Sequence, residues 1–161
     1  MSENSALVKG VNRAWDAGLV VVVAAGNNGP RTMSITTPGI SRKVITVGCS
    51  DDDREVLVGG NRMVDYSGRG PTAACICKPD LVAPGCSVVS CSSRADKYTI
   101  KSGTSMSTPI VSGAVALLLE RFPDMTNKDV KLRLRESSVD IGLPRNQQGW
   151  GLLDVGKMIG K

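Results

Sequence analysis

A chain of 161 residues is normally a single domain, and 41% hydrophobic and 22% charged residues are ordinary proportions for a globular protein. The net charge of +5 suggests no nucleic-acid partner, because the densest basic group (Lys128, Lys131 and Arg135) shares one solvated helix face without aromatic neighbours. No apolar run reaches the roughly 18–20 residues of a membrane-spanning helix, so we expect no membrane partner either.

The first third of the chain predicts a helix and two buried strands. Apolar residues recur at helical spacing over residues 5–17, Ser5 is a suitable N-cap, and Gly18 ends the helix. The unbroken run over residues 19–25 predicts a strand that is apolar on both faces, as in the middle of a parallel sheet. Residues 44–49 predict a second buried strand.

Short β elements follow in the middle of the chain. Residues 51–53, three consecutive aspartates, predict a solvated turn rather than a calcium site. A hairpin is expected over residues 56–64, around two glycines. Two short strands are expected at 80–83 and 87–90, on either side of a Pro-Gly pair.

Helices dominate the last third. The strongest runs from about Thr104 to Arg121, and because it is apolar nearly all round we expect it to pass through the molecular centre. Thr126 and Asp129 resemble a capping box that opens a helix to about Ser137. Residues 154–159 predict a short closing helix.

The order of these elements predicts an incomplete sheet. The chain opens with a helix, although a doubly buried parallel strand needs neighbours and normally follows an earlier strand. We therefore infer that the N-terminal half of the sheet precedes Met1 and that residues 1–161 are one part of a larger domain. The alternative is a small complete α/β domain.

The cysteines predict thiols rather than disulfides or a metal site. Their number is odd and the sequence shows no signal peptide, so we expect reduced, buried thiols in a cytoplasmic protein. Their spacings match no usual zinc motif and the sequence contains no histidine, so we expect no metal and no cofactor. The five are Cys49, Cys75, Cys77, Cys86 and Cys91.

Ser105 is the first candidate for chemistry. A serine in the first turn of a helix is exposed and lies beside free backbone N–H groups, which can stabilise an oxyanion. Pro109 lacks an N–H, so the Ser105 carbonyl has no partner four residues later and the first turn stays irregular. The alternative is that Thr104 or Ser105 is only a helix N-cap.

Asn27 is the second candidate. It follows a predicted parallel strand, at the edge of the sheet where open α/β folds bind ligands. Its side-chain amide offers two uncharged N–H donors for an oxyanion. The alternative is an asparagine that serves only the turn in which it lies.

The chain resembles the subtilisin-like serine proteases over nearly its whole length. Six stretches match that family in the expected order, which is far more specific than any one match. They are Val21 to Asn27, Thr37 to Gly48, Tyr66 to Pro71, Lys78 to Gly85, Gly103 to Met106, and Gly149 to Asp154.

The resemblance implies a fold and a set of roles. The fold would be part of the three-layer subtilisin-like α/β architecture, with a mainly parallel sheet flanked by helices. Ser105 would be the nucleophile, and the Asn27 side chain and the Ser105 backbone N–H would form the oxyanion hole. Ala25, Gly26 and Thr104 would bind a polypeptide substrate.

The departures from the family pattern matter as much. The family's triad runs Asp, His and Ser along the chain, and only the serine is present here. Ile110 stands where the family often has a non-catalytic histidine. We therefore expect residues 1–161 alone to be inactive, to need the missing half of the domain, and to self-associate through exposed sheet edges. The alternative is a catalytically dead relative that binds a peptide or a partner.

Overall fold

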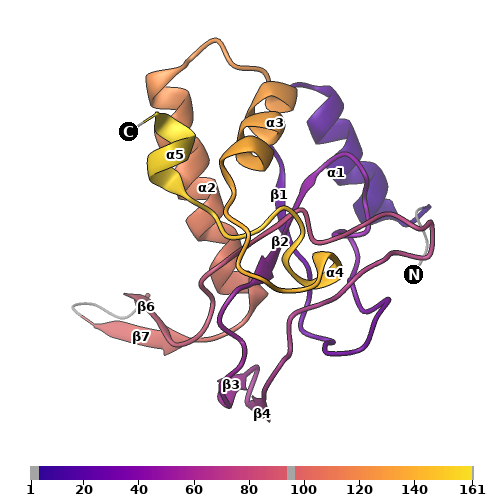
Figure 1. The fold of residues 1–161 in the computed structure, drawn as a ribbon, viewed down its shortest axis with the longest axis vertical. Helices are drawn as coiled ribbons and strands as arrows, with labels where there is room; N and C mark the ends of the chain where they lie inside the picture. The colour runs from indigo at the N-terminus through magenta and orange to yellow at the C-terminus, as the bar shows by residue number, and fades with distance from the viewer. Residues whose placement is uncertain (1–3, 94–96, 161) are drawn as a thin grey trace.

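The computed structural model describes residues 4–93 and 97–160 (Figure 1). In the described residues one helix is followed by a run of short strands and then by the remaining helices, in a mixed α/β fold that contains a parallel sheet flanked by helices, which confirms the predicted fold class. None of the described helices combines the length and the apolar character that a membrane crossing needs. The elements are α1 (Ala6–Asp16), β1 (Val22–Ala24), β2 (Ile45–Cys49), β3 (Val56–Val58), β4 (Asn61–Met63), β5 (Leu81–Ala83), β6 (Val88–Cys91), β7 (Tyr98–Lys101), α2 (Thr104–Arg121), α3 (Asn127–Ser137), α4 (Arg145–Gln148) and α5 (Val155–Ile159).

The central sheet has the order β1-β2-β5, and both pairings are parallel. Every residue of β2 is buried, because this strand has a neighbour on each side. β1 differs from its prediction: it is only three residues long and half-buried. Among the described residues β1 pairs with β2 alone, so its other edge is open, whereas β2 has a neighbour along both edges.

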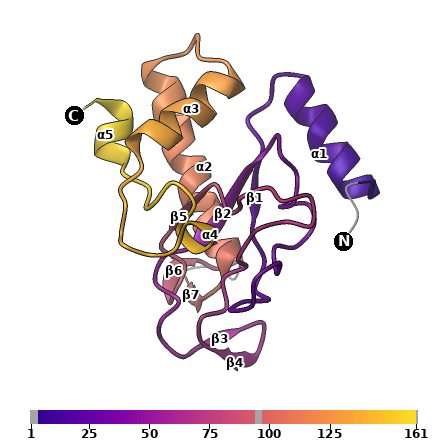
Figure 2. The same cartoon turned by 45° about the vertical axis from the view of Figure 1, so that its right-hand side comes forward.

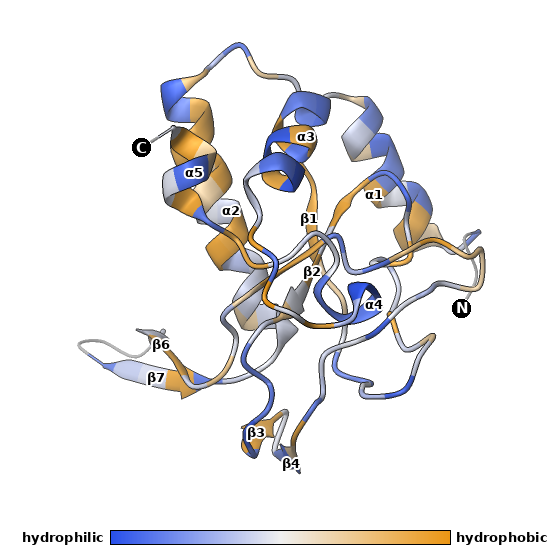
Figure 3. Ribbon diagram, in the orientation of Figure 1, coloured by the Kyte–Doolittle hydropathy of each residue, from blue (hydrophilic) through white to orange (hydrophobic). Residues whose placement is uncertain are grey.

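Helix α2 packs across all three strands of this sheet. Figure 2 shows α1 on one side of the strands and α2, α3 and α5 on the other. The face of α2 that includes Val111 and Leu118 is fully buried, whereas Leu117 is 49% exposed. The expectation of a helix buried all round is therefore wrong, because the sheet covers one face only. Figure 3 shows hydrophobic residues along much of the length of α2.

The helix ends follow the predicted capping rules. Ser5 Oγ accepts the N–H of Val8 at 3.3 Å at the start of α1, and Thr126 and Asp129 form a complete capping box on α3. Asp154 caps α5 in the same way. The four-residue α4 was not predicted, because so short a segment has too few residues to show a period.

Lys131 departs from the predicted solvated face. Its side chain is 19% exposed, and its Nζ donates to the carbonyls of Lys43 and Val44 at 2.9 Å each. Lys78 is buried beside it, paired with Asp80 and bonded to the carbonyl of Val44 at 3.0 Å. Burial lowers the pKa of Lys78 to about 8, because loss of hydration outweighs the attraction of Asp80.

The predicted solvated turn at 51–53 is also different. Asp52 is buried and accepts the N–H of Ser67 at 2.7 Å, and burial raises the pKa of this carboxyl. Asp51 accepts the N–H of Gly85 at 2.7 Å. These two carboxylates tie the end of β2 to two later loops, a long-range role that a run of acidic residues does not reveal.

Candidate active site

The loop that follows β1 is fixed by backbone hydrogen bonds from three other segments. The Ala25 N–H donates to Val47 O at 2.8 Å, and the Ala25 carbonyl accepts the N–H of Thr36 at 2.8 Å. The Gly26 carbonyl accepts the N–H of Gly68 at 2.8 Å. Gly26 has a φ of 95°, and a Cβ there would lie 2.2 Å from Thr36 Oγ1, so only glycine fits. The loop therefore holds the next residue, Asn27, in one place.

Helix α2 begins without a side-chain cap of its own. Its N-cap is Gly103, with a φ of 136°, so the alternative that Thr104 or Ser105 is the N-cap is wrong. The Gly103 N–H donates to Gly85 O at 2.9 Å, which anchors the turn that precedes the helix. A first turn without a local cap leaves N–H donors for other groups.

Asn27 supplies the missing cap from the other loop. Its Oδ1 accepts both the backbone N–H and the hydroxyl of Thr104, each at 3.0 Å. Thr104 Oγ1 in turn accepts the N–H of Gly26 at 3.2 Å. Residues 77 positions apart are thus joined in one small network.

This network fixes which way the Asn27 amide points. A backbone N–H can only donate, so the side-chain oxygen must face Thr104 and the nitrogen must face away. The two Nδ2 hydrogens have no acceptor among the described residues. A Cβ on Gly103 would lie 3.2 Å from this nitrogen, so glycine keeps the space beside it clear.

Ser105 is exposed and stands next to this contact. Neither its hydroxyl nor its backbone N–H has a hydrogen-bond partner within residues 4–93 and 97–160. Ser105 therefore carries an exposed hydroxyl and a free helix-terminal N–H directly after Thr104, the residue that the Asn27 amide oxygen contacts. Free donors at a helix N-terminus favour negative charge, as an oxyanion would bring.

Two of the predicted substrate-binding residues, Gly26 and Thr104, belong to this network, and the third, Ala25, directly precedes Gly26. Ala25 and Thr104 are fully buried, and Gly26 is half-buried. The Thr104 side chain is fully engaged in holding Asn27 and Gly26, a positioning role that the sequence did not indicate. In the sequence, the only sign of this role is that Thr104, a residue with a hydroxyl group, directly precedes Ser105.

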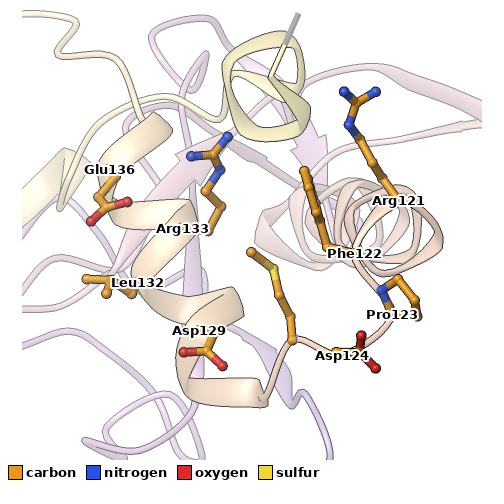
Figure 4. A pocket seen from close by; sticks show the side chains of 9 residues that line it. Arg121, Phe122, Pro123, Asp124, Asp129, Leu132, Arg133 and Glu136 are labelled. Atoms are coloured by element: carbon orange, nitrogen blue, oxygen red, sulfur yellow. The ribbon is translucent and has the colours of Figure 1, made fainter.

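The described surface also contains a pocket of about 580 Å³ away from this region. It lies between the end of α2 and α3, where Arg121, Phe122 and Arg133 surround it (Figure 4). Ser105 lies at the opposite end of α2, about 24 Å away along the helix axis. The pocket therefore belongs to a different part of the molecule.

Comparison with known proteins finds the same family that the sequence motifs resemble. A family model described as "Subtilase family" matches residues 1–151. Serine protease AprX of Bacillus subtilis (strain 168) is 43% identical over 145 residues, which cover 82% of this chain and 33% of AprX. Subtilisin DY of Bacillus licheniformis is 34% identical over 156 residues, covering 96% of this chain and 52% of that protein.

A solved structure has the same fold. "Structure of Prenylagaramide maturation protease PagA" matches with a TM-score of 0.72 and 24% identity, covering 94% of this chain and 53% of that one. The chain thus spans about a third of AprX and about half of the other two proteins.

The predicted cytoplasmic location is wrong. A relative from Natrialba magadii, 33% identical over 138 residues, is named "Halolysin-like extracellular serine protease Nep", which points away from the cytoplasm. The prediction rests on the odd number of cysteines and the lack of a signal peptide. The expectation that the thiols are buried is also wrong for Cys75, Cys77 and Cys91, which are exposed. All five are free in the structure, but free thiols do not by themselves fix a compartment.

Proposed function

Because this chain belongs to the subtilase family, we propose that it supplies the nucleophile and the oxyanion hole for hydrolysis of peptide bonds. Ser105 is the proposed nucleophile, and the Asn27 Nδ2 group and the Ser105 N–H are the proposed oxyanion donors. The substrate is a polypeptide. The contact of Asn27 Oδ1 with Thr104 carries the proposal, since it commits the amide oxygen to the residue before Ser105 and leaves the Nδ2 hydrogens for an oxyanion.

The reaction needs a base that this chain does not contain. The Ser105 oxygen attacks the substrate carbonyl while its proton passes to a base, and the carbonyl oxygen gains negative charge. The base then protonates the leaving amine, and water hydrolyses the acyl-enzyme by the same two steps. The sequence has no histidine. We therefore propose that the histidine and aspartate of the triad come from chain outside residues 1–161.

The free edge of β1 supports the proposal that part of the catalytic domain lies outside residues 1–161. β1 pairs only with β2 among the described residues, and Leu19 just before it is 60% exposed. A parallel strand with an open edge and apolar neighbours favours another strand as its partner. In the complete protease the proposed partner is the N-terminal half of the domain. In the isolated chain it is a second copy.

Labelling with a fluorophosphonate probe tests the proposed function. The full-length parent should be labelled at Ser105, and Ser105→Ala should abolish labelling. Ser112→Ala is the matched control, because this exposed serine lies on the same helix and should leave labelling unchanged. Labelling of the parent at another serine, or none at all, would overturn the assignment.

A second candidate function rests on the same missing base. Without a histidine, the fold could bind a peptide or a partner subunit and perform no chemistry. The sequence upstream of Met1 distinguishes the two. Aspartate and histidine motifs of the family there support the protease, whereas a native start at Met1 supports the binding protein.

A further inference from the structure

Two thiols and a carboxylate converge close to the start of α2, outside the network of Asn27 and Thr104. Cys49 ends β2, Asp51 lies in the turn after it, and Cys86 follows β5. Their ligand atoms (two Sγ and one carboxylate oxygen) all lie within 4.8 Å of one another. Both cysteines are free, Cys49 is buried, and the other two residues are half-buried.

The surrounding hydrogen bonds hold this group in position. Asp51 Oδ1 lies 3.1 Å from Cys49 Sγ, and it accepts the backbone N–H of Gly85 at 2.7 Å and of Cys86 at 3.2 Å. The Tyr66 hydroxyl, on a fully buried side chain, lies 3.2 Å from Cys49 Sγ and 3.1 Å from Cys86 Sγ. Hydrogen bonds therefore hold the two sulfurs and the carboxylate in place, and the site is half-buried at Asp51 and Cys86.

The donor set matches a soft or borderline divalent cation. Zinc binds cysteine sulfur at about 2.3 Å and carboxylate oxygen at about 2.0–2.2 Å, so its ligand atoms stand about 3.5–3.8 Å apart. Atoms already within 4.8 Å can reach that spacing through small side-chain rotations. A hard ion such as Ca²⁺ would instead require six or more oxygen ligands.

We propose that Cys49, Asp51 and Cys86 form a binding site for Zn²⁺ or a similar thiophilic divalent cation. The two thiols lose their protons to solvent as the metal–sulfur bonds form, and water takes the fourth position on the half-buried side. The Tyr66 hydroxyl donates its one hydrogen to a thiolate sulfur and helps to orient it, as outer-shell groups do in metal sites. Local spacing in the sequence could not predict this site, because its two cysteines follow different strands.

A single residue, Gly85, links the site to the turn that precedes Ser105. Gly85 donates to Asp51 through its N–H and accepts the Gly103 N–H through its carbonyl at 2.9 Å. A Cβ on Gly85 would lie 2.3 Å from Ser107 Oγ and 2.8 Å from Cys49 Sγ. Metal binding therefore stiffens the segment on which Gly103, the N-cap of α2, rests.

Titration with Co²⁺ tests the proposal on the full chain. Cobalt bound to thiolate gives a sulfur-to-metal charge-transfer band, and Zn²⁺ should displace it. The exposed cysteines Cys75, Cys77 and Cys91 are first changed to serine, so that only Cys49 and Cys86 remain. We expect one equivalent of Co²⁺ to bind in this background with the charge-transfer band retained.

Two further variants assign the ligands. Cys86→Ser should abolish the band and weaken Zn²⁺ binding by at least about 100-fold. Tyr66→Phe should keep the band and weaken binding about 10–100-fold, the usual effect of losing an outer-shell hydrogen bond. Circular dichroism verifies that each variant is folded, and Cys86→Ser is a near-isosteric change at a half-buried position.

Three results would overturn the proposal. The band could vanish when the three exposed cysteines are replaced, which would place the metal on them. The background protein could bind no Co²⁺ under reducing conditions. The background protein could also lose two hydrogens in mass under air, which would identify Cys49 and Cys86 as a disulfide pair. If it then bound no metal even after reduction, the proposal would be overturned.

Discussion

Asn27 Oδ1 accepts the backbone N–H of Thr104 at 3.0 Å, so a residue after β1 caps a helix that begins far away in the sequence. The contact satisfies a helix terminus and, at the same time, leaves the Nδ2 hydrogens of Asn27 without an acceptor among the described residues. Structural and chemical roles of Asn27 are therefore separable by substitution.

Asn27→Asp should separate these two roles. The aspartate keeps an oxygen that accepts the Thr104 N–H, but it loses both N–H donors and adds a negative charge. In the complete protease we expect kcat to fall by about 10²–10³-fold or more, the loss seen when subtilisin itself loses one oxyanion-hole donor. Thermal unfolding should change little. Asn28→Asp, at the exposed neighbouring position, is the control and should keep nearly full activity.

Thr104→Val should destabilise the protein. The valine leaves the half-buried Gly26 N–H without its acceptor, and because an unmet buried donor costs about 1–3 kcal/mol, we expect a loss near the lower end of that range. Thr104→Ser keeps the hydroxyl and should lose much less. Urea unfolding measures both variants, and equal stabilities would show that the hydroxyl network contributes nothing.

Lys78 should give the stability a specific dependence on pH. Burial lowers its pKa from the usual 10.5 to about 8 in the folded state, so the unfolded state binds more protons between these values. The free energy of unfolding of the wild type, relative to Lys78→Met, should therefore rise with pH from about 8 to about 10.5. The full rise is at most about 3 kcal/mol. A difference between the two proteins that stays constant over this range would contradict the prediction.

The isolated chain should self-associate through the open edge of β1. Light scattering should show dimers or larger species as concentration increases. Leu19→Lys adds a charge beside that edge and should shift the population toward monomer. Leu57→Lys is the matched control, because that leucine is 63% exposed on the separate β3–β4 hairpin. A monomeric wild type at high concentration would refute this interface.

Local patterns predicted the elements whose determinants are local. Residues 6–16 and 104–121 form helices as their spacing indicates, and the Thr126–Asp129 capping box is present. Strand β2 forms, and is buried throughout, where a largely apolar run predicts a buried strand. These features depend on residues within one or two turns, or on a short apolar run.

The misjudged features depend on contacts between distant segments. Lys131 occupies a helix face that looked solvated, yet carbonyls at positions 42–44 surround its ammonium group. Asp52 is buried, and the backbone N–H of Ser67, in another loop, donates to its carboxylate. The role of Thr104 likewise appears only when β1 and α2 meet. Period and composition along one segment cannot reveal such partners.

A crystal structure of the full-length protein with a peptide boronate bound would show whether Ser105 and Asn27 act on the same carbonyl group. A boronate forms a tetrahedral adduct with a serine and places an oxygen where the oxyanion develops. We predict a bond from boron to Ser105 Oγ, with the boronate oxygen about 2.7–3.1 Å from both Asn27 Nδ2 and the Ser105 nitrogen. An adduct on another residue, or an oxygen beyond hydrogen-bond reach of Asn27, would contradict the account.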